Sequence, residues 1–312
     1  MIWEKIGFFK VPQGRYPWMH SHAQLPTALP LGGQRVRVLF ASRTAESRSH
    51  IAFADLIFKS NPDRFEVERV SAEPVLLPGP IGFFDEHGVY PSCVVQHDGR
   101  YYLYYIGWNQ GVEAPLFYAA IGLAISDDGL VFRKHSPAPL LSRSEFDPCL
   151  VTSPHVYVED GHWHMTYVSG IGWNRGAGGK LYSRYHIKSA QADDPFNWRR
   201  KGCVAIDFAA GETNLARPCV VKSSSGWYQM WFSYAHSGAG KYRIGYAESK
   251  DGIIWDRKDH LSGIGLDNEY AREAICYPCV FTLGTETYML YNGDCFGEAG
   301  FGVAKQVGSR RA

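Results

Sequence analysis

The sequence predicts an all-β fold, and more narrowly a five-bladed β-propeller whose N-terminal strand completes the last blade. Two observations support this prediction: a segment that recurs about every sixty residues, and a composition suited to many short strands. The 312 residues include 19 Tyr, 9 Trp, 33 Gly and 17 Pro. Aromatic residues favour strands, while Gly and Pro favour the turns between them. Propellers often exceed the usual size of one domain, so residues 1–312 are expected to form a single five-bladed domain.

The recurring unit begins with a proline that opens an apolar run, followed by a turn and a strand rich in Tyr or Trp. Four copies read VYPSCVVQHDGRYYLYYIGWN, TSPHVYVEDGHWHMTYVSGIGWN, ARPCVVKSSSGWYQMWFSYAHSG and CYPCVFTLGTETYMLYNGD, and the first copy, QLPTALPLGGQRVRVLFASR, is weaker but in register. The prolines are Pro26, Pro91, Pro154, Pro218 and Pro278. The middle copies continue into AIGLAISDDGLVF, YHIKSAQADDPFNW and YRIGYAESKDGIIW. Four short antiparallel strands per unit is the composition of a propeller blade.

The two ends of the chain predict how the ring closes. The fifth copy stops at FGVAKQ without an outer strand, whereas the N-terminal IWEKIG resembles the outer-strand segments WDRKD and WRRKG. We therefore expect the N-terminal strand to complete blade five. A two-sheet sandwich would not generate five equivalent units with one of them split across the termini.

Bulk properties narrow the class of partner. The formal net charge is +1, with 45% hydrophobic and 20% charged residues, so no strong field favours nucleic acid or an anionic membrane. The segment MIWEKIGFFKVPQ lacks the basic and apolar regions of a signal peptide, and no run approaches the ~18 apolar residues of a membrane span. We expect a cytoplasmic protein, without nucleic-acid or membrane partners, whose oligomeric state is unknown.

Neither a disulfide framework nor a metal or cofactor site is expected. Seven cysteines are spread thinly over the chain, and Cys276 and Cys279 lie in an apolar run, which is typical of core thiols. His22, His87 and His155 could meet at the axis, but their spacing is not a ligand signature. The sequence also lacks a GxSxG elbow and a phosphate-binding loop in a strand-to-helix context.

The geometry of a blade selects the residues of one mouth. The inner strand begins on the face of the disc where the second strand ends, so these segments of all five blades surround one depression. They carry Arg, Asn, carboxylate and Trp side chains, which suit a sugar because hydroxyls need planar polar partners and C–H faces stack on aromatic rings. The expected substrate-binding residues are His22, Gln24, Glu86, Trp108, Ser153, Trp173, Arg217, Tyr277 and Asn292. For Arg217 a tie between blades, and for Trp108 and Trp173 a packing role, remain alternatives.

The whole chain resembles a group of uncharacterised glycosidase-like propeller proteins that are often encoded with bacterial surface-polysaccharide genes. The resemblance rests on HAQLP, FDEHGVYPS, YYIGWNQG, SPHVYVEDG, YHIKSAQ, ARPC, YRIGYAESKDGIIW, AICYP and YNGDCFGEAGFG. More distantly, this group is similar to the five-bladed glycoside hydrolase families that include arabinanases, xylosidases, fructosidases and mannoside phosphorylases. The resemblance spans all five units and implies a propeller that acts on saccharides.

The sequence departs from these families at their catalytic positions. Arabinanase-type enzymes place an acid directly before the first-unit proline, another directly after the second-unit proline, and a glutamate two residues before the third-unit proline. This chain has Leu25, Ser92 and Thr152 there. The fold analogy therefore survives, but the catalytic trio does not transfer.

Other carboxylates are needed for catalysis. Glycoside hydrolysis uses two carboxyl groups, about 5–5.5 Å apart for retention or 6.5–9.5 Å for inversion. We expect Asp85 and Glu273 to form this pair, because each lies five or six residues before an inner-strand proline, with Glu86, Asp147 and Glu212 in reserve. Asp85 and Asp147 could instead cap turns, and Glu273 could belong to a solvated ion pair.

The leading functional hypothesis is an enzyme acting on a glycosidic bond of a bacterial saccharide, by hydrolysis or phosphorolysis. If phosphate were the acceptor, Arg217, Arg272 or the loop residues Arg43 and Arg48 would have to lie at the mouth. The alternative is a propeller without the usual catalytic carboxylates that binds or modifies a sugar or nucleotide sugar. A scaffold for protein partners is a third possibility, which would need a large exposed apolar patch.

Overall fold

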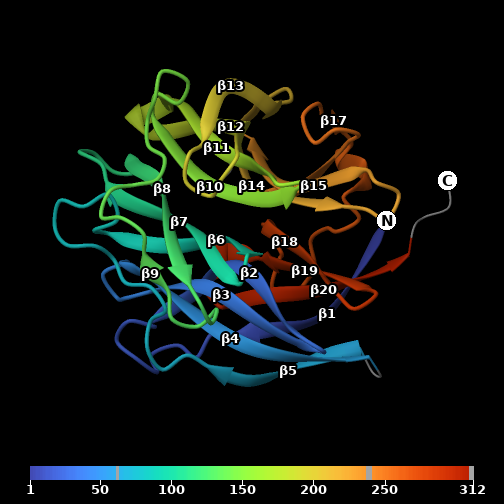
Figure 1. Cartoon of the computed structure of the whole chain (residues 1–312). Coiled ribbons are helices and arrows are strands. Elements are labelled where there is room, and N and C mark those ends of the chain that lie inside the picture. Colours follow the sequence, from blue (N-terminus) through green and yellow to red (C-terminus); the bar gives the residue numbers. More distant parts are fainter. Residues whose placement is uncertain (61–62, 237–240, 309–312) are drawn as a thin grey trace.

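The computed structural model describes residues 1–60, 63–236 and 241–308 of the chain. These residues form twenty strands and three short 3-10 segments, Ala177–Gly179, Asp259–Leu261 and Asp294–Phe296. The inner strands of the five units gather at the centre of the view in Figure 1, and the outer strands lie at its periphery. The all-β, five-bladed propeller that the repeat predicts is therefore confirmed.

Each blade follows the predicted order of strands. Blade one consists of β2 (Ser21–Gly32), β3 (Arg35–Arg43), β4 (Ser49–Ser60) and β5 (Asp63–Val70), and blade two of β6 (Gly88–His97), β7 (Arg100–Gln110), β8 (Phe117–Ser126) and β9 (Arg133–Lys134). Blade three consists of β10 (Leu150–Glu159), β11 (His162–Arg175), β12 (Leu181–Ala192) and β13 (Arg199–Ile206), and blade four of β14 (Glu212–Lys222), β15 (Tyr228–His236), β16 (Arg243–Ser249) and β17 (Asp256–Arg257).

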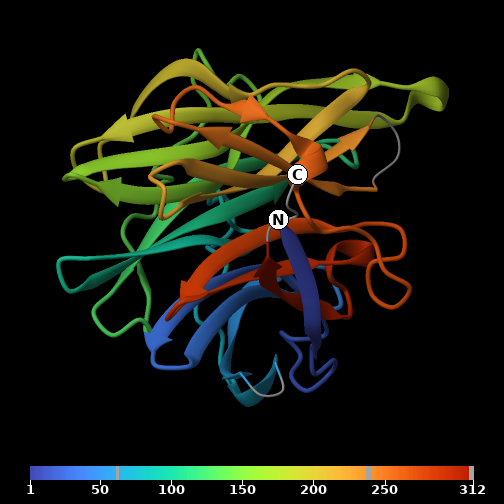
Figure 2. The ribbon, with the colours of Figure 1, turned by 90° about the vertical axis from the view of Figure 1, so that its right-hand side faces the viewer.

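The fifth blade joins the two ends of the chain. It consists of β18 (Cys276–Leu283), β19 (Glu286–Asn292), β20 (Gly300–Gly308) and β1 (Ile2–Lys10), which are hydrogen-bonded in the order β1-β20-β19-β18. Strand β1 runs antiparallel to β20, with Ile2 opposite Gly308 and Lys10 opposite Gly300. Figure 2 shows the N-terminal strand in blue beside the red C-terminal strand. The predicted split of the last blade across the termini is confirmed.

Hydrophobic cores lie between neighbouring blades, which explains why the inner and middle strands are apolar on both faces. Separate clusters join blades one and two, two and three, three and four, and four and five. A further cluster joins blade five to blade one, with Phe9 and Phe301 packed against Phe40. Because every blade packs on two neighbours, the ring is closed by side-chain packing as well as by the β1–β20 pairing.

A buried arginine ties three blades together at the axis. Arg217 lies on β14 of blade four and is 2% exposed. Its Nη1 donates to the carbonyl of Ser92 and, at 2.9 Å, to Ser92 Oγ in blade two. Its Nη2 donates to Thr27 Oγ1 at 2.8 Å and to the carbonyl of Pro26 at 3.3 Å in blade one. Arg217 therefore connects neighbouring blades, which was the alternative to substrate binding for this residue.

His155 adds a pH-sensitive contact beside that arginine. Its Nε2 lies 2.9 Å from the carbonyl of Val220, which joins β10 to β14. Burial, reinforced by the charge of Arg217, lowers the pKa of His155 to about 4. Because the unfolded chain takes up this proton near pH 6.5, the stability present above that pH is lost as the pH falls toward 4.

We therefore expect protonation of His155 to lower the free energy of unfolding by about 2 kcal/mol between pH 7 and pH 4. This value is smaller than the free energy equivalent to the whole pKa shift, because the ring is partly exposed to solvent. Urea unfolding across this range measures the effect. His155→Gln, whose amide can still donate to Val220, should flatten the pH dependence. An unchanged slope in this variant would show that His155 is not the titrating group.

No helix in the described ranges is both long and apolar enough to cross a bilayer. Cys276 and Cys279 are buried, free thiols, in agreement with their expected core position.

Candidate functional site

A cavity of about 760 Å³ opens on the face where the inner strands begin. Every blade contributes to its lining through the start of its inner strand: Gln24 and Leu25 from β2, Tyr90 from β6, Thr152 and Ser153 from β10, Ala216 from β14, and Tyr277 from β18. The loops after β3 and β7 complete the wall. The structure thus has a concave site at the mouth selected by the blade geometry.

The prolines of the repeat explain how side chains reach this cavity. The residue directly before the proline has a left-handed backbone in four blades: φ is 56° at Leu25, 48° at Ser153, 51° at Arg217 and 56° at Tyr277. The strand pairing is irregular at each of these places. A non-glycine residue in this region is strained, and a residue before proline is further restricted. Such strain is typical of functional sites. Three of the four side chains, all except that of Arg217, line the cavity.

One wall of the cavity is aromatic. Trp108 and Phe117, at the ends of β7 and β8, line it together with Tyr90 and Tyr277. The indole Nε1 of Trp108 donates to Ser49 Oγ at 3.1 Å. A Cβ at Gly88 would lie 2.0 Å from Ser49 Oγ and 2.6 Å from Trp108 Nε1, so only glycine allows this approach. The ring of Trp108 is therefore held in place at the wall, where it can stack against a ligand.

A second wall of the cavity belongs to blade one and is polar. Arg43 ends β3 and Arg48 directly precedes β4, and the turn between them is closed by hydrogen bonds between Thr44 and Arg48, including Thr44 N to Arg48 O at 2.9 Å. Arg43, Glu46, Ser47 and Arg48 all line the cavity, and Arg43 Nη2 donates to Gln24 Oε1 at 2.5 Å. Guanidinium groups in a concave site can hold a carboxylate, a phosphate or a pair of hydroxyls.

The structure brings four of the nine expected binding residues to the cavity: Gln24, Trp108, Ser153 and Tyr277. Arg217 is occupied at the axis, as described above. Asn292 is fully buried and connects β19 to the backbone of Leu25, Ala23 and Gly300. These two residues organise the floor and the ring without lining the cavity.

The other three expected binding residues lie around the site. Trp173 packs edge-on against Phe117, with 5.5 Å between ring centroids, so it supports the aromatic wall. Glu86 accepts a hydrogen bond from the backbone of Gly82. His22 contacts Ser21 at 2.8 Å, and burial together with the charge of Arg43 lowers its pKa to about 4.

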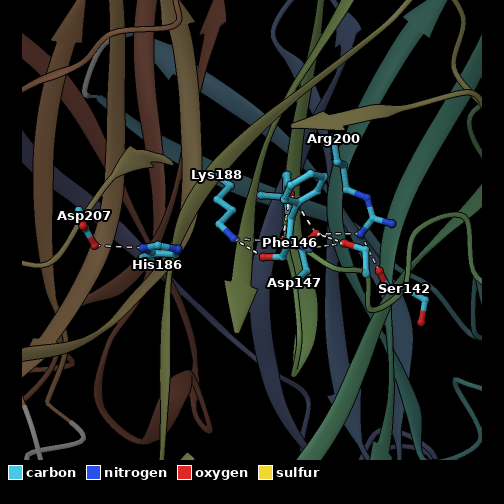
Figure 3. A network of polar contacts seen from close by, with 9 residues as sticks. Ser142, Phe146, Asp147, His186, Lys188, Arg200 and Asp207 are labelled. Atoms are coloured by element: carbon cyan, nitrogen blue, oxygen red, sulfur yellow. Dashed lines mark hydrogen bonds and ion pairs between the residues drawn. The ribbon is translucent and has the colours of Figure 1, made fainter. Parts of the chain in front are cut away.

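The reserve carboxylate Asp147 is fully buried in a polar network shown in Figure 3. Its Oδ2 accepts a hydrogen bond from Arg200 Nη1 at 2.9 Å, and Lys188 Nζ lies 3.6 Å from Oδ1. The hydroxyl of Tyr167 donates to the same carboxylate at 3.2 Å. Asp147 is absent from the cavity lining, and its partners fix the segment before β10 onto the outer part of blade three.

Equivalent pairs recur in other blades. In each, an acid from the start of the inner strand or the segment before it meets a base on the outermost strand of the same blade: Asp85 with Lys134 at 2.6 Å, Glu212 with Arg257 at 2.6 Å, and Asp267 with Lys5 at 2.7 Å. Lys5 lies on β1, so the N-terminal strand also supplies the base of blade five. Repetition of the pair favours a role in the framework of the ring.

Glu273 has different surroundings. Its side chain is 67% exposed, and Lys241 Nζ lies 3.5 Å from its carboxylate. The solvated ion pair considered as an alternative is the arrangement observed. The structure therefore brings none of the four expected catalytic carboxylates, Asp85, Glu273, Asp147 and Glu212, to the lining of the mouth cavity. Among the described lining residues, the carboxylate is that of Glu46.

Several lining residues were absent from the expected binding set, notably Tyr90, Phe117, Tyr185 and the two arginines of blade one. A signal for the arginines exists in the loop SRTAESRS, which follows the second strand of the first unit and has no counterpart in the other units. The tyrosines carry no comparable signal, because Tyr is common throughout these strands. No group of three or more His, Cys, Asp or Glu side chains suited to a metal ion is found in the described ranges.

Solved structures of propeller glycoside hydrolases are similar to this chain. A thermostable family-43 glycoside hydrolase superposes with a TM-score of 0.66 and 18% identity, over 97% of this chain and 94% of the other. A glycosyl hydrolase from Bacteroides ovatus gives a TM-score of 0.68 and 16% identity, over 99% of this chain and 96% of the other. At this identity the similarity establishes the fold.

Sequence relatives extend the comparison. The 1,2-beta-oligomannan phosphorylase of Thermoanaerobacter sp. is 24% identical over 141 residues, which cover 45% of each chain. The Uncharacterized protein MT1551 of Mycobacterium tuberculosis is 35% identical over 308 residues, which cover 97% of this chain and 99% of the relative. No protein-family model matches the sequence. The high coverage and identity show that this chain belongs to the same family as the mycobacterial protein MT1551.

Proposed function

We propose that this protein is an enzyme that acts on a glycosidic bond of a saccharide bound in the mouth cavity. The observation that supports this most directly is the lining itself, where all five inner strands converge and Trp108 lies together with Arg43 and Arg48. A sugar would stack a C–H face on the indole and place its hydroxyls against Gln24 and Ser153. The glycoside hydrolase fold and the partial similarity to a mannoside phosphorylase support the same class.

The reaction breaks the bond between the anomeric carbon and the glycosidic oxygen, joins the carbon to an acceptor oxygen, and transfers a proton to the leaving oxygen. Glu46 is the first candidate for proton transfer. Hydrogen bonds from its own backbone amide and from Thr44 hold the pKa of this carboxylate below its usual range. The carboxylate is thus ionised and can accept a proton from the acceptor, although its lowered pKa makes it a weaker base than an ordinary glutamate.

The test is a panel of glycosides, including 1,2-linked mannosides, incubated with purified protein in the presence and absence of inorganic phosphate. Release of reducing sugar or of sugar phosphate is measured. Trp108→Ala removes the stacking surface and is expected to lower kcat/KM by about tenfold or more, while Glu46→Gln lowers kcat by a similar or larger factor. Glu273→Gln is the matched control, because its carboxylate is exposed outside the cavity.

A second function is favoured by one observation. The described lining contains Glu46 but no second carboxylate, so it lacks the pair used by the two standard geometries of glycoside hydrolysis. The alternative is a propeller that binds or modifies a sugar or nucleotide sugar without hydrolysis. Saturable binding of such a ligand, weakened by Trp108→Ala and without turnover in either buffer, would favour this alternative. If the protein neither turns over nor binds any of the ligands tested, both functions are contradicted.

A further inference from the structure

The blade-one wall of the cavity holds positive charge that the described carboxylates do not neutralise. Neither Arg43 nor Arg48 forms an ion pair with a described Asp or Glu, whereas Arg175, the last residue of β11 in blade three, is paired with Glu113 at 2.7 Å. The lining contains two positive side chains, Arg43 and Arg48, and one negative side chain, Glu46. Histidine apart, its net charge is therefore +1. The depressed pKa of the neighbouring His22, in part caused by Arg43, is consistent with this field.

The two guanidinium groups are also under-used as donors. Arg43 donates one hydrogen bond, to Gln24, and its buried Nε has no described partner. Arg48 donates from Nη2 to the carbonyl of Glu86 at 2.6 Å, which leaves its other donors without a described side-chain partner. An arginine has five N–H donors in a planar fork, and a buried donor without a partner costs free energy. Arg43 Nε is therefore a buried donor without a described acceptor, and the exposed Arg48 has further donors available to a ligand.

The local backbone presents both arginines together. They end β3 and precede β4, two adjacent antiparallel strands in which Arg43 is opposite Ser49. The turn between them is closed by Thr44, and Ser47 adopts a left-handed backbone with φ of 65°. Gln24 holds Arg43 from β2, and the carbonyl of Glu86 holds Arg48 from the segment before β6. Both side chains are thus anchored from neighbouring elements, which lowers the cost of ordering them around a ligand.

We propose that this wall is a binding subsite for a phosphate group, held by Arg43 and Arg48. This inference rests on the proposed function, because it assigns the group that accompanies the saccharide in the cavity. A phosphate carries nearly two negative charges and three or more acceptor oxygens, so it can engage two forks at once, whereas a carboxylate is satisfied by one. With the phosphate on this wall, an attached or adjacent sugar ring would lie in the same cavity as Trp108.

The group has two sources with the same chemistry: inorganic phosphate as a second substrate, or a phosphate ester on the saccharide. The experiment titrates the full-length protein with inorganic phosphate and, separately, with a hexose 1-phosphate, followed by calorimetry or phosphorus NMR. Saturable binding of inorganic phosphate alone supports the subsite and a free second substrate. Binding of the hexose 1-phosphate alone supports the subsite and an esterified saccharide.

Variants assign the binding to this wall. Arg48→Gln and Arg43→Gln are each expected to weaken phosphate binding by about tenfold or more, since each removes charge-assisted hydrogen bonds. Arg175→Gln, at the end of β11 and outside the cavity lining, should leave the affinity within about twofold of the parent and controls for loss of a surface arginine. Thermal unfolding identifies any variant that is not folded, and Arg48 is exposed enough for its substitution to be tolerated.

The outcomes separate this inference from the proposed function. Phosphate binding that depends on Arg43 and Arg48, in a protein inactive on every glycoside, would support the subsite while contradicting the activity. Glycoside turnover without binding of either phosphate ligand would overturn the subsite while leaving the activity. Phosphate binding unchanged in both arginine variants would also overturn it, because the ligand would then occupy another surface.

Discussion

Replacing Arg217 with alanine is expected to lower the free energy of unfolding by about 3–5 kcal/mol. The side chain is buried, and its removal leaves the Ser92 and Pro26 carbonyls without their donor while opening a void at the axis. The hydroxyls of Ser92 and Thr27 lose a partner as well. Because the contacts connect blade four to blades one and two, the loss affects the whole ring. Chemical unfolding followed by near-UV circular dichroism measures it.

Arg217→Lys is the informative companion. It keeps the charge, but an ammonium group cannot reproduce a fork that donates to two blades, so an intermediate loss of stability is expected. Ligand binding by the folded fraction of either variant should persist, because Arg217 does not line the cavity. A loss below about 1 kcal/mol in Arg217→Ala would contradict the structural role.

Replacing Asp147 with alanine is also expected to lower the free energy of unfolding, by about 3–5 kcal/mol, because the positive charges of Arg200 and Lys188 then lie close together without their carboxylate. The acid is fully buried, whereas Lys188 is 6% exposed. Asp193→Ala in the same blade is the matched control. Its carboxylate is paired with Arg199 at 2.6 Å but is 64% exposed, so its removal should cost less than about 1 kcal/mol.

Asp147→Ala also separates the two interpretations of this carboxylate. A catalytic role predicts a variant of nearly unchanged stability that has lost turnover. A framework role predicts the reverse: reduced stability with activity retained in the folded fraction. A double-mutant cycle of Asp147→Ala and Arg200→Ala tests the interaction between these two residues. The coupling free energy between the two substitutions should be large.

The architecture could be predicted from the sequence because each unit repeats the same local pattern. The proline, the apolar run and the Tyr- or Trp-rich strand recur in each blade, and the split of the fifth unit follows from the missing strand after FGVAKQ. That residues 1–312 fold as one domain stays a prediction, for which one cooperative unfolding transition of the parent protein would be the expected result.

The candidate site was predictable only in part. Blade geometry selected the face on which the cavity opens, and with it four lining residues, Gln24, Trp108, Ser153 and Tyr277; that a substrate binds there stays a prediction. The same geometry could not reveal that Asp85, Asp147 and Glu212 meet bases far along the chain, since Lys134, Arg200 and Arg257 are 49, 53 and 45 residues away. Charge pairing at such separation depends on register between the inner and outer strands of a blade, which sequence spacing alone does not define.

The left-handed residues before the prolines have a consequence for how this family can change its ligand. Each contributing blade presents one side chain to the floor through a backbone shape that its own proline and strand pairing maintain. A substitution at Ser153 therefore alters one sector of the floor, whereas one at Leu25 or Tyr277 also changes the apolar cluster that these residues form with neighbouring blades. If the cavity binds the proposed saccharide, relatives that share the ring could change their specificity one blade at a time, and these three positions are where such differences are expected first.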